Sequence, residues 1–102
     1  MRTSITRPKE SAIALRAECS TDSLIVELVD GRRLSVPLAW YPRLLHGRPD
    51  ERSRLELIGE GDGIHWPDLD EHVSVEGLLG GRKSMESSSS LKQWLAKRES
   101  PR

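Results

Sequence analysis

The chain has 102 residues, of which 35% are hydrophobic and 4% aromatic, and its 16 basic and 16 acidic residues give no formal net charge. This length suits one small domain, and no window is long and apolar enough to span a membrane. Cys19 is the only cysteine, which excludes an internal disulfide, and no signal-peptide pattern is present, so we expect a cytoplasmic protein.

The zero net charge hides an asymmetry along the chain. Residues 10–80 contain seven Arg, no Lys and 14 acidic residues, whereas residues 1–9 and 81–102 carry net charges of +3 and +4. An acidic body favours a basic partner, and basic ends favour anionic partners. The alternative is that the charge only keeps a small domain in solution.

The first predicted strand follows a polar, basic arm over residues 1–10. Alternation over residues 12–19 predicts a strand with one buried face. The inner face would carry Ile13, Leu15, Ala17 and Cys19. A cysteine in phase with the inner face is expected to be a structural thiol and not a reactive one.

A hairpin is predicted next. Residues 24–29 are rich in β-branched side chains and favour a central strand. Asp30-Gly31 is a strong turn signal, because glycine tolerates the positive φ of tight hairpin turns. Residues 32–36 would form the return strand, with Leu34 and Val36 facing inward.

The period then changes to that of a helix over residues 38–45. Its apolar stripe would consist of Leu38, Tyr41, Leu44 and Leu45. Pro42 and Pro49 each suit the first turn of a helix, where the missing N–H does no harm. Two short helices or turns are therefore expected before residue 55.

A second hairpin is predicted from residues 55–58 and 64–66, with the glycine-rich turn 59–63 between them. Pro67 ends this strand, and residues 68–71 would form a solubilising acidic loop. We expect Trp66 to be buried in the core. Ser74 can cap a short helix over residues 75–79, which Gly80-Gly81 would end.

The C-terminal segment reads as a polar linker, residues 82–90, followed by a short amphipathic helix within residues 91–102. Ser90 and Gln93 have the spacing of a capping box, and Leu91, Trp94 and Leu95 form an apolar patch. A lone short helix is marginal in water, so it should dock on its own domain or on a second copy.

Chemistry-bearing side chains are few. A metal could in principle be bound by a set consisting of His46, His65, His72, Asp68, Asp70 and Glu71. Their spacing fits no zinc motif, and no serine lies in a nucleophile elbow. We therefore expect no metal, no cofactor and no catalytic residues. The candidate partner-binding residues are Asp68, Asp70, Glu71, Leu91, Trp94 and Leu95.

Four runs of sequence together resemble a known family. They are residues 30–38, 40–45, 63–71 and 74–79, and the tail pattern Ser90-Leu91-x-x-Trp94-Leu95 is similar to that of its shorter members. The family is the bacterial one catalogued as domain of unknown function 2442. The resemblance implies a small α+β domain and supplies no catalytic residues.

The same resemblance implies two directions for function. Some members carry a DNA-binding helix-turn-helix after this domain, which a chain of this length would not hold. Some relatives are encoded beside a family of proposed small toxins, which suggests an antitoxin role.

These patterns predict an α+β fold with a small, mostly antiparallel sheet, short helices packed on it and a C-terminal helical tail. The domain would span residues 11–81. The favoured function is a binding module whose acidic body meets a basic partner protein, such as a small toxin, with a homodimer through the C-terminal helix as a further expectation. A DNA-binding autoregulator that uses the basic ends, or an enzyme, is the alternative. Nucleic acid is not an expected partner, because no recognition helix is visible. A membrane is not an expected partner either, because no window is long and apolar enough to span one.

Overall fold

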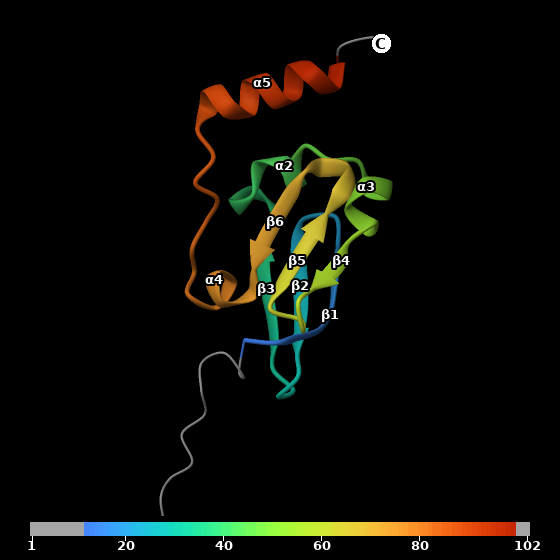
Figure 1. Cartoon of the computed structure of the whole chain (residues 1–102), viewed down its shortest axis with the longest axis vertical. Helices are drawn as coiled ribbons and strands as arrows, with labels where there is room; N and C mark the ends of the chain where they lie inside the picture. Colours follow the sequence, from blue (N-terminus) through green and yellow to red (C-terminus); the bar gives the residue numbers. More distant parts are fainter. Residues whose placement is uncertain (1–11, 100–102) are drawn as a thin grey trace, which may run out of the picture.

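The computed structural model describes residues 12–99, and the arm predicted for residues 1–10 and the end of the predicted tail lie outside this range. The described chain has an α+β fold, as predicted. It contains two three-stranded antiparallel sheets in the orders β1-β2-β3 and β4-β5-β6. The sheets overlap in Figure 1, and their inner side chains form one core.

The first sheet follows the predicted hairpin closely. Its strands are β1 (Ala14–Cys19), β2 (Ser23–Leu28) and β3 (Arg33–Pro37). The predicted central strand is central, with buried residues Leu24, Val26 and Leu28 alternating along β2. The hairpin turns at Gly31, whose φ of 97° is the left-handed conformation that a tight turn requires.

Strand β1 departs from the predicted alternation at one residue. Ala14 pairs with Leu28 and Arg16 with Glu27, so Leu15 is an extra residue opposite one peptide of β2. Such a bulge reverses the phase of the side chains. The prediction that Leu15 faces inward is therefore wrong: Leu15 is 52% exposed and Ala14 is buried.

The predicted helical stripe is divided into two short pieces, η1 (Leu38–Trp40) and α2 (Pro42–Leu45). The break falls at Tyr41, whose φ of −128° is extended, because the residue before a proline avoids the helical region. Leu38, Tyr41 and Leu44 are buried as predicted, but Leu45 is exposed. The second short helix, α3 (Pro49–Ser53), begins at Pro49 as expected.

The second sheet contains one strand that the sequence did not indicate. Its strands are β4 (Glu56–Ile58), β5 (Gly63–Trp66) and β6 (Glu71–Ser74). Trp66 is fully buried, as predicted, and its indole N–H donates to the carbonyl of Arg52 at 3.0 Å. The region predicted as an acidic loop instead forms η2 (Pro67–Leu69) and enters β6 through Asp70, which has a positive φ of 52°.

Two close contacts join the sheets and the helix α4 (Val75–Leu79). The amide of Ala14 donates to the carbonyl of Gly61 at 2.7 Å, and the amide of Val75 donates to that of Asp62 at 3.0 Å. The predicted cap of α4 is confirmed, since the Ser74 hydroxyl accepts a bond from Gly77 N–H at 2.8 Å.

The last helix, α5 (Ser88–Glu99), begins three residues before the predicted start at residue 91. The hydroxyl of Ser87 accepts a bond from the amide of Ser90 at 3.1 Å. Ser87 is therefore the capping residue, and the capping role predicted for Ser90 is wrong. In Figure 1, α5 crosses one end of the domain, above α2 and α3.

Burial raises the pKa of the Cys19 thiol to about 11, with a partly opposing effect from Arg52. The thiol is therefore protonated at neutral pH, in line with the structural role predicted for it. Among residues 12–99, no helix combines the length and apolar character that crossing a membrane requires.

Candidate functional site

The candidate site is a groove of about 750 Å³ beside strand β6. Residues 70–74 form one wall, residues 81–86 form the other, and Tyr41 and Arg43 contribute between them. The segment of residues 82–87, here called the strap, has no regular secondary structure. It runs from α4 to α5 along the free side of β6 (Figure 1).

The strap is held by specific contacts with the residues around η1 and α2. The Tyr41 hydroxyl donates to the carbonyl of Arg82 at 2.8 Å, and the amide of Ser84 donates to the carbonyl of Trp40 at 3.0 Å. The ammonium of Lys83 lies 5.6 Å from the centre of the Trp40 ring. These contacts keep the far wall of the groove at a fixed place.

Arg43 connects the two walls at one end of the groove. Its guanidinium contacts Glu86 at 2.7 and 2.9 Å through two nitrogens, and it donates to the carbonyl and the carboxylate of Asp70 at 2.9 and 3.2 Å. The Arg43 and Glu86 side chains are only 16% and 9% exposed. The bonds from Arg43 lower the pKa of Glu86, so this pair stays charged at neutral pH.

Glu71 is the electrostatically unusual group of the groove. Burial raises the pKa of its carboxyl to about 7; Arg43 partly opposes this effect, while Glu86 and Asp70 add to it. Within the described residues, no hydrogen bond or ion pair joins the Glu71 carboxylate to another side chain. The groove therefore holds a half-buried carboxyl group that changes charge near neutral pH.

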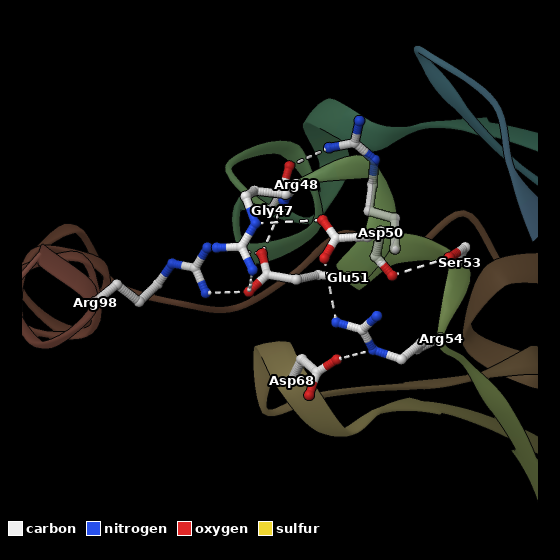
Figure 2. Close-up of polar contacts among 9 residues, drawn as sticks. Gly47, Arg48, Asp50, Glu51, Ser53, Arg54, Asp68 and Arg98 are labelled. Carbon is white, nitrogen blue, oxygen red and sulfur yellow. Dashed lines mark hydrogen bonds and ion pairs between the residues drawn. The ribbon is translucent and has the colours of Figure 1, made fainter.

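Helix α5 attaches beside the groove through Trp94, which packs against the core. The guanidinium carbons of Arg43 and Arg98 lie 5.1 and 4.7 Å from the centre of its ring, within the range of cation–π attraction. The Ser90 hydroxyl also donates to Glu86 at 2.7 Å. Figure 2 shows a further contact, in which Arg98 reaches the carboxylate of Glu51.

The six residues predicted as partner-binding do not form one surface. Asp70, Glu71 and Trp94 gather around Arg43, whereas Asp68 pairs with Arg54 (Figure 2). Leu91 and Leu95 are partly exposed on α5 and do not line the groove. In the acidic cluster predicted from the sequence, Asp68 and Asp70 therefore form ion pairs with arginines. Glu71 forms no ion pair within the described residues.

Several residues that line the groove or attach α5 were not among the partner-binding residues predicted from the sequence. They are Arg43, Glu51, Arg82, Lys83, Glu86 and Arg98. Only Glu51 carried a signal, because an acidic residue in the first turn favours a helix start, and its carboxylate accepts the Arg48 amide at 2.8 Å. The others pair with partners distant in sequence, which a local pattern does not reveal.

The histidines do not converge on a metal site. His65 lies 3.1 Å from Glu56 across β4 and β5, while His46 and His72 are exposed. Within residues 12–99, no group of three or more His, Cys, Asp or Glu side chains is arranged to hold a metal ion.

The class defined by this architecture is a small α+β domain with two short antiparallel sheets and a C-terminal helix. The chain belongs to the family described as "Protein of unknown function (DUF2442)", whose model matches residues 14–84. This match confirms the resemblance read from the sequence. Helix α5, with Trp94 and Arg98, follows the matched region.

Two solved structures are similar to the chain. A protein of unknown function from Rhodospirillum rubrum has a TM-score of 0.65 and 28% identity, covering 72% of this chain and 92% of that one. The uncharacterized protein CV0863 from Chromobacterium violaceum has a TM-score of 0.62 and 21% identity, covering 85% and 76%. The second likeness concerns the fold alone. The comparison with curated proteins finds no match.

Proposed function

We propose that this chain is a protein-binding module without catalytic activity, and that its partner binds in the groove between β6 and the strap. The observation that supports the proposal is the groove itself. It is about 750 Å³ in volume, open to solvent, and bordered by the edge strand of a sheet. Grooves of this size beside an exposed strand edge are common sites of peptide recognition.

The charge of the groove favours a basic partner at one end. Three carboxylates, those of Asp70, Glu71 and Glu86, act on a single guanidinium, that of Arg43. Arg82 and Lys83 lie on the strap wall of the groove and are not among the charges that shift the pKa of Glu71. The excess of negative charge is therefore confined to the Glu71 end, where it attracts a cationic side chain. An antitoxin that binds a small basic toxin is one particular form of this proposal, with the contact in the groove and not across a broad acidic face.

Photo-crosslinking from the groove in the native host tests the proposal. A photoreactive amino acid replaces Met85, which is 95% exposed on the groove wall. The matched control replaces Leu15, which is 52% exposed on β1 of the other sheet. We expect one defined protein to crosslink at position 85 and not at position 15. Equal crosslinking at both positions, or none at position 85, would count against the proposal.

The crosslinked protein is then purified and its affinity for the full chain measured at several salt concentrations. Screening acts over about 10 Å at 0.1 M salt, so a partner attracted by the Glu71 end of the groove should bind more weakly as salt rises. Affinity that is independent of salt would remove the basic partner from the proposal.

A further inference from the structure

We propose that the groove binds an extended segment of a partner protein as a fourth strand on the free edge of β6, with a Lys or Arg side chain of that segment pairing with Glu71. This inference rests on the proposed function and specifies the chemistry of the partner. It follows from the backbone of β6, from the position of the strap and from the distribution of charge.

The backbone of β6 has one free side. Strand β6 is at the edge of its sheet, and its register with β5 pairs Ile64 with Val73 and His65 with His72. The bond from Val75 N–H to the Asp62 carbonyl continues this ladder. Because bonded and non-bonded pairs alternate in an antiparallel ladder, the amide and carbonyl of His72 and the amide of Ser74 point away from β5.

The strap does not use these groups. Its backbone amides of Arg82 and Ser84 donate to the carbonyls of Gly77 and Trp40. Between the strap and β6 the described residues form no backbone hydrogen bond, and the groove separates the two walls instead. An added strand would lie about 4.8 Å from β6 and satisfy the outward groups of His72 and Ser74.

The side chains around the groove specify a basic residue near Glu71. Asp70 and Glu86 both bond to Arg43, while no bond or ion pair of the described chain reaches the Glu71 carboxylate. The other cations of the groove lie on the strap, where the ammonium of Lys83 is over the Trp40 ring, so a cation from the partner would pair with Glu71 and replace the water lost on burial. Met85, on the opposite wall, offers an exposed apolar contact for a neighbouring side chain of the segment.

Selection from a library of random eight-residue peptides displayed on phage, with the full chain as the target, tests the inference. Selected peptides are synthesised and titrated into the isotope-labelled protein while amide resonances are followed. We expect a Lys or Arg at one fixed position of the selected sequences, and the largest shifts at the amides of His72 and Ser74.

Two variants of the experiment examine the two contacts separately. N-methylation of the peptide at the alternate residues that face β6 should abolish binding, whereas methylation of the intervening residues should not. Glu71→Gln should weaken binding at least about tenfold, which is typical of a lost charged hydrogen bond, while Glu18→Gln on the other sheet should leave it unchanged.

Several results would overturn the inference. They are a selection without binders, shifts confined to α5, binding that tolerates N-methylation everywhere, and equal affinity of the Glu71→Gln variant. Concentration-dependent shifts at His72 and Ser74 without peptide would instead identify a second copy as the occupant and would also overturn it. The failures of the two proposals can be told apart. Shifts confined to α5 would contradict strand addition at β6 but would not affect the result of the crosslinking experiment. A failed crosslink would contradict the proposed function but would not affect the result of the peptide titration.

Discussion

The guanidinium of Arg98, near the end of α5, lies 2.7 Å from the carboxylate of Glu51 in the first turn of α3 (Figure 2). Among residues 12–98, Glu51 is the one buried charged residue, with 4% of its surface exposed. Its remaining bonds come from Arg48, through the backbone amide at 2.8 Å and the guanidinium at 3.5 Å. The tail helix therefore completes the charge balance of a buried group in its own domain.

Replacing Arg98 tests the strength of this contact. Arg98→Met leaves the buried Glu51 carboxylate without its closest cation, and we expect a loss of about 1–3 kcal/mol in the free energy of unfolding. Urea denaturation at pH 7 measures it. Lys97→Met, at the exposed neighbouring position, should change stability by less than about 0.5 kcal/mol. Equal effects of the two substitutions would show that the ion pair does not stabilise the docked helix.

Removing α5 distinguishes docking on the same chain from docking on a second copy. A chain that stops after Ser87 keeps the strap and the Arg43–Glu86 pair but loses Trp94 and Arg98. We expect a lower melting temperature and an unchanged oligomeric state by sedimentation, because both attachments lie within one chain. If the intact protein is a dimer and the shortened one a monomer, α5 is exchanged between copies, which is the homodimer proposed from the sequence.

Trp66→Ala tests the centre of the core. Trp66 is fully buried and its indole donates to Arg52, so the substitution leaves a large cavity and an unpaired carbonyl. We expect a loss of about 3–5 kcal/mol, measured as a shift of the denaturant midpoint. Val29→Ala, at a position that is 55% exposed, is the matched control and should cost much less. A midpoint unchanged by Trp66→Ala would be incompatible with its place in the core.

The sequence predicted the parts of the fold that local patterns encode. The hairpin at Gly31, the cap at Ser74 and the buried Trp66 each follow from residues close together in the chain. Strand β6 was missed because Val73 is its only apolar residue, so its four residues show no alternation of apolar and polar side chains, although their burial does alternate. The bulge at Leu15 was missed because an extra residue is visible only against the partner strand.

The candidate site was less accessible to sequence reasoning than the fold. The structure places Asp70 and Glu71 around Arg43, and their role in binding a partner stays a prediction. The pKa of Glu71, however, depends on Arg43 and Glu86. Arg43 lies 27 residues from its partner Asp70 and 43 residues from its partner Glu86. The acidic run of residues 68–71 therefore overstated the acidity of this surface, because Arg54 and Arg43, from elements distant in the chain, pair with Asp68 and Asp70.

Gly61 and Gly31 form a matched pair for testing how the sheets are joined. Both have a positive φ, 101° and 97°, so alanine is strained at each. A Cβ at Gly61 would lie 2.5 Å from the Ala14 carbonyl oxygen, whereas none lies within 4 Å at Gly31. We expect Gly31→Ala to cost about 1 kcal/mol and Gly61→Ala at least about 1 kcal/mol more, by urea denaturation. Equal losses of stability for the two substitutions would mean that β1 and the turn at Gly61 can move apart without a measurable energetic cost.

The raised pKa of Glu71 predicts how stability depends on pH. The pKa rises from an ordinary 4.5 to about 7, mainly through burial, with Arg43 opposing and Glu86 and Asp70 adding to the effect. The pKa of the Tyr41 hydroxyl is raised as well, mainly by burial and further by the charge of Glu71, while Arg82 opposes the effect. Between these two values the folded state binds more protons than the unfolded state, so the free energy of unfolding falls as pH rises through the window.

Glu71→Gln removes this dependence, because the amide does not ionise. From pH 5 to pH 8 the natural chain should lose roughly 1–3 kcal/mol more stability than the variant. Urea denaturation at the two pH values gives the difference, and the carboxyl resonance of Glu71 gives the pKa directly. Glu86 and Glu51 have lowered pKa values and stay ionised across this range, so they do not mask the effect. Parallel pH profiles for the natural chain and Glu71→Gln would show that water reaches the Glu71 carboxylate as freely as in the unfolded chain.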